Sequence, residues 1–487
     1  MSSSASALSR MDYARVLLVL VVVTGLHAIV APLAGLDLAF DESQYWLWSK
    51  HLDWSYYSKG PLVAWSIAAS THLFGDGEWQ VRLPAWLAFD VFLILLFAFA
   101  RDMAGKWRAA WWALLLGATT PVYFTLGSVA TTDAFLLPCW TAATWAVFRA
   151  VRDGSPSAWI AAGFAAGLGT LTKMSIVLLP GFVFIALLLH RDTRTRLATP
   201  WPWLAMVVML VVAAPVLGWN AANDWVMFRH ERGHIGDFKP SLERPLTLVS
   251  TQWLILSPLI ATVAFVQLRS RPLDPALRVL WLTSLMAGVF FVAKSVLDKV
   301  YPNWPAPVYV SFLVLFAARI PALSSRLRGW LIAGMAGSVV MIIVAMFPHW
   351  LGVRITPFKD LVGWRHQASE IAAQSGPTDF LIATDYHIAS SFAFYWPERI
   401  PVYVGGGTDW RRSQFNLWSG LEREAGDSGV IVSKLDQLPA TATAAFSQCM
   451  PLVPVEAVSL QGIRVRTLYS WKCSGHRRIA WPAPQRY

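Results

Sequence analysis

One segment organises the chain: Asp41-Glu42-Ser43-Gln44-Tyr45-Trp46-Leu47-Trp48-Ser49-Lys50-His51-Leu52-Asp53-Trp54-Ser55-Tyr56-Tyr57-Ser58-Lys59-Gly60-Pro61, which follows the first long apolar run. Before position 57 it carries three acids and one lysine among five tryptophans and tyrosines. Trp and Tyr gather at the headgroup level of membranes, so we expect this segment to lie along the bilayer surface rather than cross it. Asp41, Glu42 and Lys59 would then face both water and lipid phosphates, which makes the segment the candidate catalytic loop.

The composition is typical of a polytopic membrane protein. Of the 487 residues, 56% are hydrophobic, 27 are tryptophan and 14% are charged, whereas a soluble domain has roughly 25% charged residues. Three cysteines exclude a disulfide-rich scaffold and a Cys-based zinc cluster. The first apolar run, residues 16–36, is too long for a signal-peptide core and lacks a small-residue cleavage site, so it is predicted to be a retained signal anchor.

A window of about 20 residues predicts about eleven membrane spans. Residues 109–148 contain a single charge, Asp133, and are predicted to form two spans hinged near it. Residues 158–189 are predicted to form two short spans hinged near Lys173. The remaining predicted spans are residues 16–36, 79–100, 201–220, 246–268, 279–293, 303–318 and 329–347.

The orientation follows from the basic residues of the short loops. With the N-terminus in the cytoplasm, the cytoplasmic segments hold sixteen basic residues and five acids, Asp12, Asp102, Asp153, Asp192 and Asp274. The net charge of +11 therefore reflects the basic cytoplasmic loops that set the membrane orientation, and nucleic-acid binding is not expected. The basic residues are Arg10, Arg15, Arg101, Lys106, Arg108, Arg149, Arg152, Arg191, Arg194, Arg196, Arg269, Arg271, Arg278, Arg319, Arg326 and Arg328.

The same topology brings the charged residues of the spans to one face of the membrane. Charges within or beside apolar spans are unfavourable and tend to mark functional sites. The groups predicted to emerge together on the non-cytoplasmic face are Asp41, Glu42, Lys59, Asp133, Lys173, the loop 224–244 and residues 294–299.

After Phe347 the pattern changes to that of a soluble α/β domain, residues 355–487, on the outer face. Short strand-like runs at 380–384, 401–404 and 430–432 alternate with amphipathic stretches. Residues 453–460 and 463–471 read as a hairpin around Gln461-Gly462. Cys449 and Cys473 bracket this hairpin, so a disulfide between them is predicted in an oxidising periplasm, with two buried thiols as the alternative.

Several motifs resemble those of the GT-C polyprenol-phosphate-sugar glycosyltransferases, and within them the protein mannosyltransferase and lipid A aminoarabinose transferase superfamily (families 39 and 83). The resemblance covers most of residues 12–320, and it departs at Lys59-Gly60-Pro61, where many relatives have two prolines. The motifs are Asp41-Glu42, Tyr57-Ser58-Lys59-Gly60-Pro61-Leu62, Phe74-Gly75-Asp76, Val81-Arg82-Leu83-Pro84, Thr132-Asp133-Ala134-Phe135, Gly167-Leu168-Gly169-Thr170-Leu171-Thr172-Lys173, Pro215-Val216-Leu217-Gly218-Trp219-Asn220 and Lys299-Val300-Tyr301-Pro302-Asn303-Trp304-Pro305.

This resemblance implies a polytopic α-helical membrane protein with the GT-C fold and a C-terminal periplasmic α/β domain. Residues 1–354 would be the transmembrane catalytic domain, with its active site on the first periplasmic loop, residues 37–78. The implied location is the bacterial inner membrane. The implied partners are a polyprenyl-phosphate-linked sugar donor, an envelope glycolipid or protein acceptor and the lipid bilayer, and no cofactor is expected.

The resemblance also implies roles for individual residues in an inverting transfer, in which the lipid phosphate is the leaving group. Asp41, with Glu42 beside it, would orient or deprotonate the acceptor, and Asp133 would bind sugar or acceptor. The lipid phosphate would be held by Lys59, and more weakly by Lys173 and Lys299. The other candidates are Tyr57 and Tyr301 for the phosphate or sugar, and Trp46, Trp54 and Asn303 for the sugar or acceptor.

Each role has a structural alternative. Asp41 and Asp133 could be helix N-caps, Lys59 could only reach the headgroups, and Lys173 could neutralise a tight turn. The aromatic residues could be interfacial anchors. His230 and His234, four residues apart, could hold a metal ion near Glu231, although no third ligand is evident and no metal site is predicted.

Two other functional classes compete with an enzyme. A transporter or flippase should show two related halves with interrupted helices, and the sequence has no internal repeat. A receptor or scaffold built on the C-terminal domain would leave the acidic loop without a role. Among enzymes, transfer to lipid A, lipopolysaccharide core or another envelope glycolipid is preferred over protein O-glycosylation, and the sequence does not specify the sugar.

Overall fold

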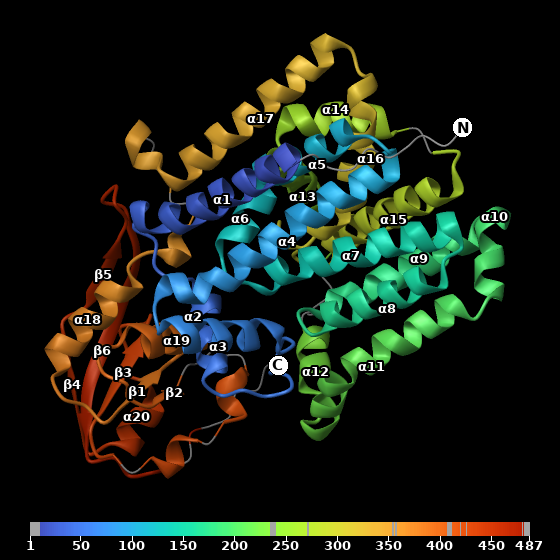
Figure 1. Cartoon of the computed structure of the whole chain (residues 1–487). Coiled ribbons are helices and arrows are strands. Elements are labelled where there is room, and N and C mark those ends of the chain that lie inside the picture. Colours follow the sequence, from blue (N-terminus) through green and yellow to red (C-terminus); the bar gives the residue numbers. More distant parts are fainter. Residues whose placement is uncertain are drawn as a thin grey trace.

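The computed structural model describes residues 10–233, 240–269, 272–352, 355, 358–406, 412–418, 420–424, 426–479 and 481. A helical membrane part forms one end of the molecule, and a domain with a six-stranded sheet forms the other (Figure 1). The expected combination of a polytopic helical membrane protein and a C-terminal α/β domain is confirmed. The predicted boundary between them, at residues 354 and 355, falls next to residues outside those described.

Six helices among the described residues are long and apolar enough to cross a membrane, and up to nine spans result if each bent pair counts as one. The expected eleven spans are not confirmed, because the helices at two of the predicted spans, Pro156–Thr170 and Ala306–Ala322, are too short to pass the same test. The six are α1 (Arg10–Leu33), α4 (Glu78–Ala104), α7 (Thr132–Asp153), α11 (Trp201–Ala222), α15 (Pro275–Leu297) and α17 (Ser325–Met346).

The remaining helices are short, and several pairs of them meet at sharp bends. The pair α5–α6 bends by 64° and the pair α13–α14 by 104°. Two other breaks, between α6 and α7 before Asp133 and between α8 and η1 at Lys173, lie where single charges interrupt the apolar sequence. The short helices of this part are α2 (Phe40–Ser49), α3 (Leu62–Phe74), α5 (Trp107–Thr119), α6 (Pro121–Ser128), α8 (Pro156–Thr170), η1 (Met174–Val177), α9 (Leu178–Leu188), α10 (Arg191–Arg194), η2 (Thr195–Ala198), α12 (Val226–Gly233), α13 (Glu243–Ile255), α14 (Pro258–Leu268), η3 (Ala306–Val308), α16 (Tyr309–Arg319), η4 (Ile320–Ala322) and η5 (Pro348–Leu351).

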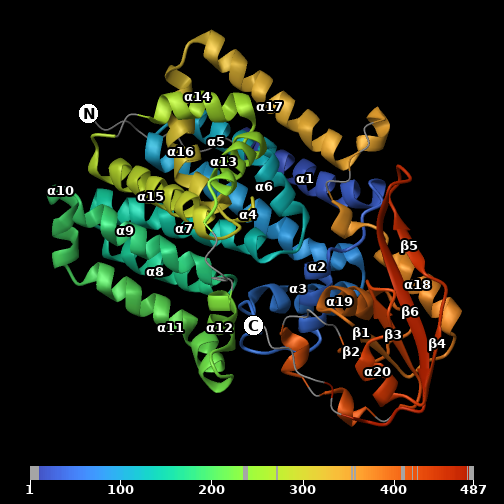
Figure 2. The same ribbon diagram turned by 180° about the vertical axis from the view of Figure 1, so that it is seen from behind.

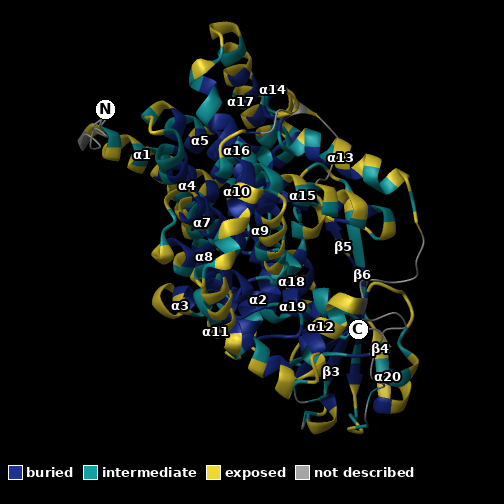
Figure 3. Cartoon of the chain, turned by 90° about the vertical axis from the view of Figure 1, so that its right-hand side faces the viewer, coloured by how far each residue is buried: buried dark blue, intermediate teal, exposed yellow. Residues whose placement is uncertain are grey.

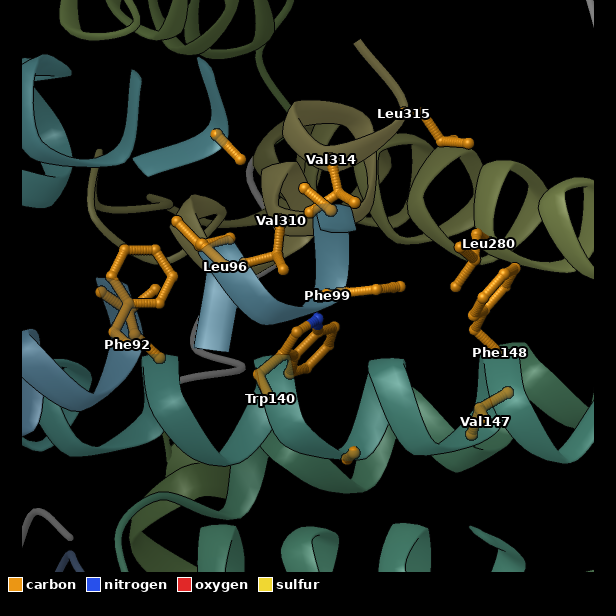
Figure 4. Close-up of a cluster of buried hydrophobic side chains, with 14 of the residues drawn as sticks. Phe92, Leu96, Phe99, Trp140, Val147, Phe148, Leu280, Val310, Val314 and Leu315 are labelled. Carbon is orange, nitrogen blue, oxygen red and sulfur yellow. The ribbon is translucent and has the colours of Figure 1, made fainter. Parts of the chain in front are cut away.

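The membrane core is built from large side chains on some helices and small ones on others. Phe92 and Phe99 of α4, Trp140 and Phe148 of α7 and Val310 of α16 meet in one buried cluster (Figure 4). The helices α8 and α11 instead approach backbone to backbone, because a β-carbon on Gly163 would lie 2.1 Å from the carbonyl oxygen of Ala205. Small residues at such crossings are the usual means of helix association in membranes.

One end of the helical part lies next to the C-terminal sheet, and the other end lies far from it (Figure 1). The helix α10 and the β-sheet lie at opposite ends of the molecule, and the view from behind agrees (Figures 1 and 2). The Arg10 end of α1 points away from the sheet. Asp90, within α4, accepts a hydrogen bond from the Thr24 hydroxyl at 2.6 Å, so this intramembrane acid has a polar neighbour.

The C-terminal domain contains a sheet of order β2-β1-β3-β6-β4, with β5 also paired to β6. The strands β2, β1 and β3 are parallel, and β6 runs antiparallel to β3, β4 and β5. The elements are η6 (Lys359–Leu361), α18 (Trp364–Ser375), β1 (Phe380–Ala383), α19 (Tyr386–Tyr395), β2 (Val402–Val404), η7 (Gln414–Asn416), η8 (Leu421–Arg423), β3 (Gly429–Ser433), α20 (Ala440–Ala445), β4 (Gln448–Pro451), β5 (Val455–Val458) and β6 (Arg464–Ser474).

The predicted hairpin is present as β5 and β6, with Gly462 in the turn at a φ of 74°. Cys449 and Cys473 are directly opposite each other on β4 and β6 and are joined by a disulfide. Cys139 of α7 is the free cysteine.

Most aromatic side chains of the first loop are buried within the protein, whereas the sequence predicted that they lie at the headgroup level. Its helix α2 packs against α3 and against α19 of the C-terminal domain, and Tyr45, Trp46 and Trp48 are buried there. This region belongs to the buried interior of the molecule (Figure 3). The buried aromatic residues of the loop therefore form a hydrophobic core between the helical part and the C-terminal domain of the same chain. The sequence alone suggested that they are anchors in the headgroup layer.

Candidate active site

Asp41 lies in the first turn of α2 and is partly exposed. The N-cap of this helix is Ala39, so the alternative that Asp41 caps it is wrong. Burial raises the pKa of the Asp41 carboxyl to about 6, and the positive charge of Lys59 opposes this shift. A carboxylate whose pKa lies near neutrality is suited to accept a proton from an acceptor hydroxyl.

Glu42, the next residue, is completely buried and has four hydrogen-bond donors around it. Arg82 Nη2 lies 3.0 Å from Glu42 Oε2, and Arg82 Nε lies 3.0 Å from Oε1. The backbone amides of Ala39 and Ala130 donate to the same carboxylate, each at 2.9 Å. With its oxygens occupied in this way, Glu42 joins the start of α2 to α4 and to the turn before α7. This geometry suits a positioning residue rather than a catalytic one.

Asp133 is 3% exposed and accepts hydrogen bonds from two residues that are distant in sequence. Lys173 Nζ lies 2.7 Å from its Oδ1, and Asn303 Nδ2 donates to its Oδ2 at 2.6 Å. The N-cap of α7 is Thr131, so Asp133 is not a cap. The three predicted site residues Asp133, Lys173 and Asn303 therefore form one cluster, and Asp41 lies near it, since both Asp133 and Lys173 act on its pKa.

Lys59 belongs to a loop that is clamped to the loop of Lys173. The Leu62 amide donates to the carbonyl of Leu171 at 2.9 Å. A β-carbon on Gly60 would lie 2.3 Å from the same carbonyl oxygen, so this close approach requires glycine. Lys59 Nζ is 3.5 Å from Glu231 Oε1, a long and half-exposed ion pair that a competing anion could replace.

Trp304 lies within cation–π distance of two lysines at the edge of this cluster. Lys173 Nζ lies 5.7 Å and Lys294 Nζ 5.3 Å from the centroid of its ring, distances typical of cation–π contacts. Lys299, predicted to bind phosphate, is exposed and lies 4.8 Å above the ring of Tyr301, which is 49% exposed. These two residues stay predictions, since no described contact joins them to Asp133 or Lys59.

Tyr57 links the site to the C-terminal domain, because its backbone amide donates to Gln414 Oε1 at 2.7 Å. Its ring packs against that of His230 at 5.1 Å. His234, the second residue of the alternative metal site, lies outside the described residues. Within the described ranges, no group of three or more His, Cys, Asp or Glu side chains could hold a metal ion.

The two predicted sugar-binding tryptophans have different environments. Trp46 is 3% exposed, donates to Asp76 Oδ1 at 2.8 Å, and packs edge-on against Phe394. Such burial leaves no ring face for a sugar, so this prediction is wrong for Trp46, which belongs to the contact with the C-terminal domain. Trp54 is 58% exposed and remains available.

Sequence reasoning missed the partners of the predicted residues. Arg82 lies in the motif Val81-Arg82-Leu83-Pro84, which predicts no role for it, although an arginine in an apolar helix usually has an acidic partner. Glu231 and Gln414 carry no sequence signal for their contacts with Lys59 and Tyr57, because those contacts depend on the folding of remote segments. Trp304 could have been found, since it directly follows Asn303 in the motif that begins at Lys299.

The sequence resembles known sugar transferases. A model of the family described as dolichyl-phosphate-mannose-protein mannosyltransferase matches residues 58–219. The lipid A galacturonosyltransferase RgtD of Rhizobium johnstonii is 29% identical over 382 residues, 74% of this chain and 77% of that protein. An undecaprenyl phosphate-alpha-4-amino-4-deoxy-L-arabinose arabinosyl transferase of Aeromonas salmonicida is 27% identical over 176 residues, 35% of this chain and 32% of that protein.

The fold has solved counterparts as well. ArnT from Cupriavidus metallidurans superposes with a TM-score of 0.68 in its apo state and 0.69 when bound to undecaprenyl phosphate. Each match covers 98% of this chain and 100% of the ArnT chain at 19% identity. The likeness therefore extends over both the membrane part and the C-terminal domain.

Proposed function

We propose that this chain, which belongs to the GT-C superfamily of glycosyltransferases, transfers a sugar from a polyprenyl-phosphate donor to lipid A or a related envelope glycolipid. The proposal depends mainly on the cluster of Asp41, Asp133, Lys59 and Lys173, which lie in first helical turns and on loops of the helical part. The similarity to a lipid A galacturonosyltransferase and to ArnT supports the donor and acceptor classes.

In this reaction the acceptor oxygen attacks the anomeric carbon while the bond from that carbon to the phosphate oxygen breaks. Asp41 takes the proton of the acceptor hydroxyl, and the polyprenyl phosphate leaves with the bonding electron pair. Lys59 balances the charge that grows on the phosphate. Asp133 keeps Lys173 and Asn303 in place beside the reacting groups. A single displacement of this kind inverts the anomeric configuration.

We expect Lys59→Ala to lower the transfer rate about a hundredfold, because a preorganised cation opposite the leaving phosphate is lost. Lys59→Arg should restore only part of the rate, since a planar guanidinium differs from a point charge. Initial rates over a range of donor concentrations measure both effects. Lys50→Ala is the matched control, because Lys50 is on the same loop and pairs with Asp76. An equal loss in both alanine variants would remove Lys59 from phosphate binding.

The function is tested with a deletion strain. Its lipid A and polyprenyl-phosphate-linked sugar are extracted and supplied to membranes that carry the protein, without any nucleotide sugar. Mass spectrometry should show one added sugar on lipid A and loss of the donor. Translocation of the donor without consumption would instead indicate a flippase.

Protein O-glycosylation is the second candidate, because the matching family model is described as a protein mannosyltransferase. It predicts that the deletion strain has unchanged lipid A and that envelope proteins lose a sugar. The same mass spectrometry applied to both fractions distinguishes the two acceptors.

For the membrane orientation we propose that the N-terminus is cytoplasmic and that the C-terminal domain is periplasmic in the inner membrane. The excess of basic residues in the short loops supports this orientation. With Cys139 replaced by serine, a cysteine at Ser58 should react with a membrane-impermeant thiol reagent on intact spheroplasts, and one at Thr195 should not. The parent without an added cysteine is the control. The reverse pattern would place the acidic loop in the cytoplasm.

A further inference from the structure

The parallel part of the C-terminal sheet contains a topological switch point between β1 and β3. The helix α19 follows β1 and packs on the sheet face that carries Leu381 and Val430. The helix α20 follows β3 and packs on the opposite face, with Ile382 and Ile431. In open α/β sheets, ligands bind in the crevice outside the carboxyl ends of the strands at such a point.

Polar side chains gather at these carboxyl ends. Asp385, Tyr386 and His387 follow β1, and Lys434 follows β3. Lys434 Nζ lies 2.7 Å from Asp385 Oδ2, and His387 Nδ1 lies 3.8 Å from Asp385 Oδ1. Asp385 also accepts a hydrogen bond from the Ile388 amide at 3.0 Å, which fixes the cluster to the start of α19. All four side chains remain partly or fully accessible.

This cluster adjoins the residue that precedes Asp41. The ring of His387 lies 3.9 Å and that of Tyr386 6.4 Å from the ring of Phe40, centroid to centroid. Tyr45, one turn further along α2, is buried, and the charges of Asp41, Asp133 and Tyr386 add to the effect of burial in raising its pKa. The helices α2 and α19 lie side by side (Figure 1). The carboxyl ends of β1 and β3 therefore lie beside the segment that carries the candidate base.

The C-terminal domain is held firmly in this position. The Tyr395 hydroxyl accepts a hydrogen bond from the Leu38 amide at 2.6 Å. Arg365 Nη2 lies 2.7 Å from Glu78 Oε1, at the start of α4. Together with the bond from the Tyr57 amide to Gln414, these contacts fix the domain to both sides of the Asp41 segment.

We propose that the carboxyl ends of β1 and β3 bind the saccharide headgroup of the acceptor and present its hydroxyl to Asp41. This inference rests on the proposed function and names the acceptor half of its site. The Asp385–Lys434 pair offers both hydrogen-bond acceptors and donors to sugar hydroxyls. His387 contacts both Asp385 and Phe40, the neighbour of Asp41. The donor half lies on different elements, the loops of Lys59 and Lys173. His387 and Lys434 are thus acceptor-positioning residues.

The test uses the full-length protein, lipid A from the deletion strain as acceptor and the extracted polyprenyl-phosphate sugar as donor. In His387→Gln and Lys434→Gln, the KM for lipid A should rise about tenfold or more, because hydrogen bonds to the headgroup are lost. The KM for the donor and kcat at saturating lipid A should stay within about twofold. Lys434 is the safer variant for folding, since its side chain is 44% exposed.

Arg464→Gln is the matched control, because Arg464 forms an exposed ion pair with Glu456 on β5 and β6 of the same domain. It should change neither KM. An unchanged KM for lipid A in Lys434→Gln and His387→Gln, or an equal rise in both KM values, would overturn the inference. Failure of the proposed function gives a different result, namely no transfer to lipid A by the wild-type protein.

Discussion

Asp41→Asn is expected to abolish measurable sugar transfer while leaving the folded protein and its amount in the membrane unchanged. Asparagine keeps the shape of the side chain and cannot accept the acceptor proton, and loss of a general base lowers rates by about 10²–10⁴-fold. Among the described residues the Asp41 side chain has no hydrogen bond or ion pair, so the substitution mainly removes its charge and the attraction to Lys59. Turnover by the purified variant, together with its thermal unfolding in detergent, measures the two expectations.

The pH dependence of the wild-type enzyme provides an independent check. The pKa of Asp41 is raised to about 6, so its carboxylate is protonated as the pH falls below that value. We expect the transfer rate to be nearly full above about pH 7, to fall to about half near pH 6 and to keep declining toward pH 5. A rate that is constant from pH 8 to pH 5 would exclude Asp41 as the base.

Asp76→Asn is the matched control for Asp41→Asn. Asp76 is an acid of the same loop that binds Lys50 and the Trp46 indole, and asparagine can still accept from both. Transfer should stay near the wild-type rate. Near wild-type turnover in Asp41→Asn would remove Asp41 from the mechanism.

Much of the site could be predicted from isolated charges in apolar sequence. A single aspartate in a forty-residue apolar run and a single lysine in the next run marked the breaks before α7 and before η1, and the structure joins Asp133 to Lys173 at 2.7 Å. A charge that must leave the membrane interior does so at a helix end and finds an opposite charge there. Isolated charged residues of this kind can therefore be identified as site candidates from the sequence alone.

The surroundings of α2 could not be predicted in this way. Its aromatic residues have the composition of an interfacial segment, and only the position of α19 turns them into a core. That position depends on contacts between the first loop and residues more than 300 positions later, such as the hydrogen bond from Leu38 to Tyr395. Local patterns carry no information about which remote part of the chain will cover a segment. For this reason the prediction that Trp46 binds a sugar was wrong.

The role of Glu42 was also hidden from sequence reasoning, because its partner Arg82 lies 40 residues later in the chain. Breaking this buried pair should have the second large effect that we predict. Arg82→Met is expected to lower the free energy of unfolding by about 3–5 kcal/mol, because it leaves the Glu42 carboxylate buried without its partner. Glu42 is 0% exposed, and Arg82 also donates to the Asp37 carbonyl at 2.6 Å. The start of α2 would lose its attachment to α4, so transfer should fall together with stability.

The double variant Glu42→Gln with Arg82→Met separates a structural pair from a catalytic acid. Without the buried charge, it should be more stable than Arg82→Met alone, because the unpaired carboxylate is the main source of the penalty. Thermal unfolding of the single variants and the double variant in detergent gives the coupling between the two residues. If Glu42 only positions α2, the double variant should recover part of the transfer rate along with its stability. A double variant that is as stable as the wild type and yet inactive would instead make Glu42 a participant in the chemistry beside Asp41.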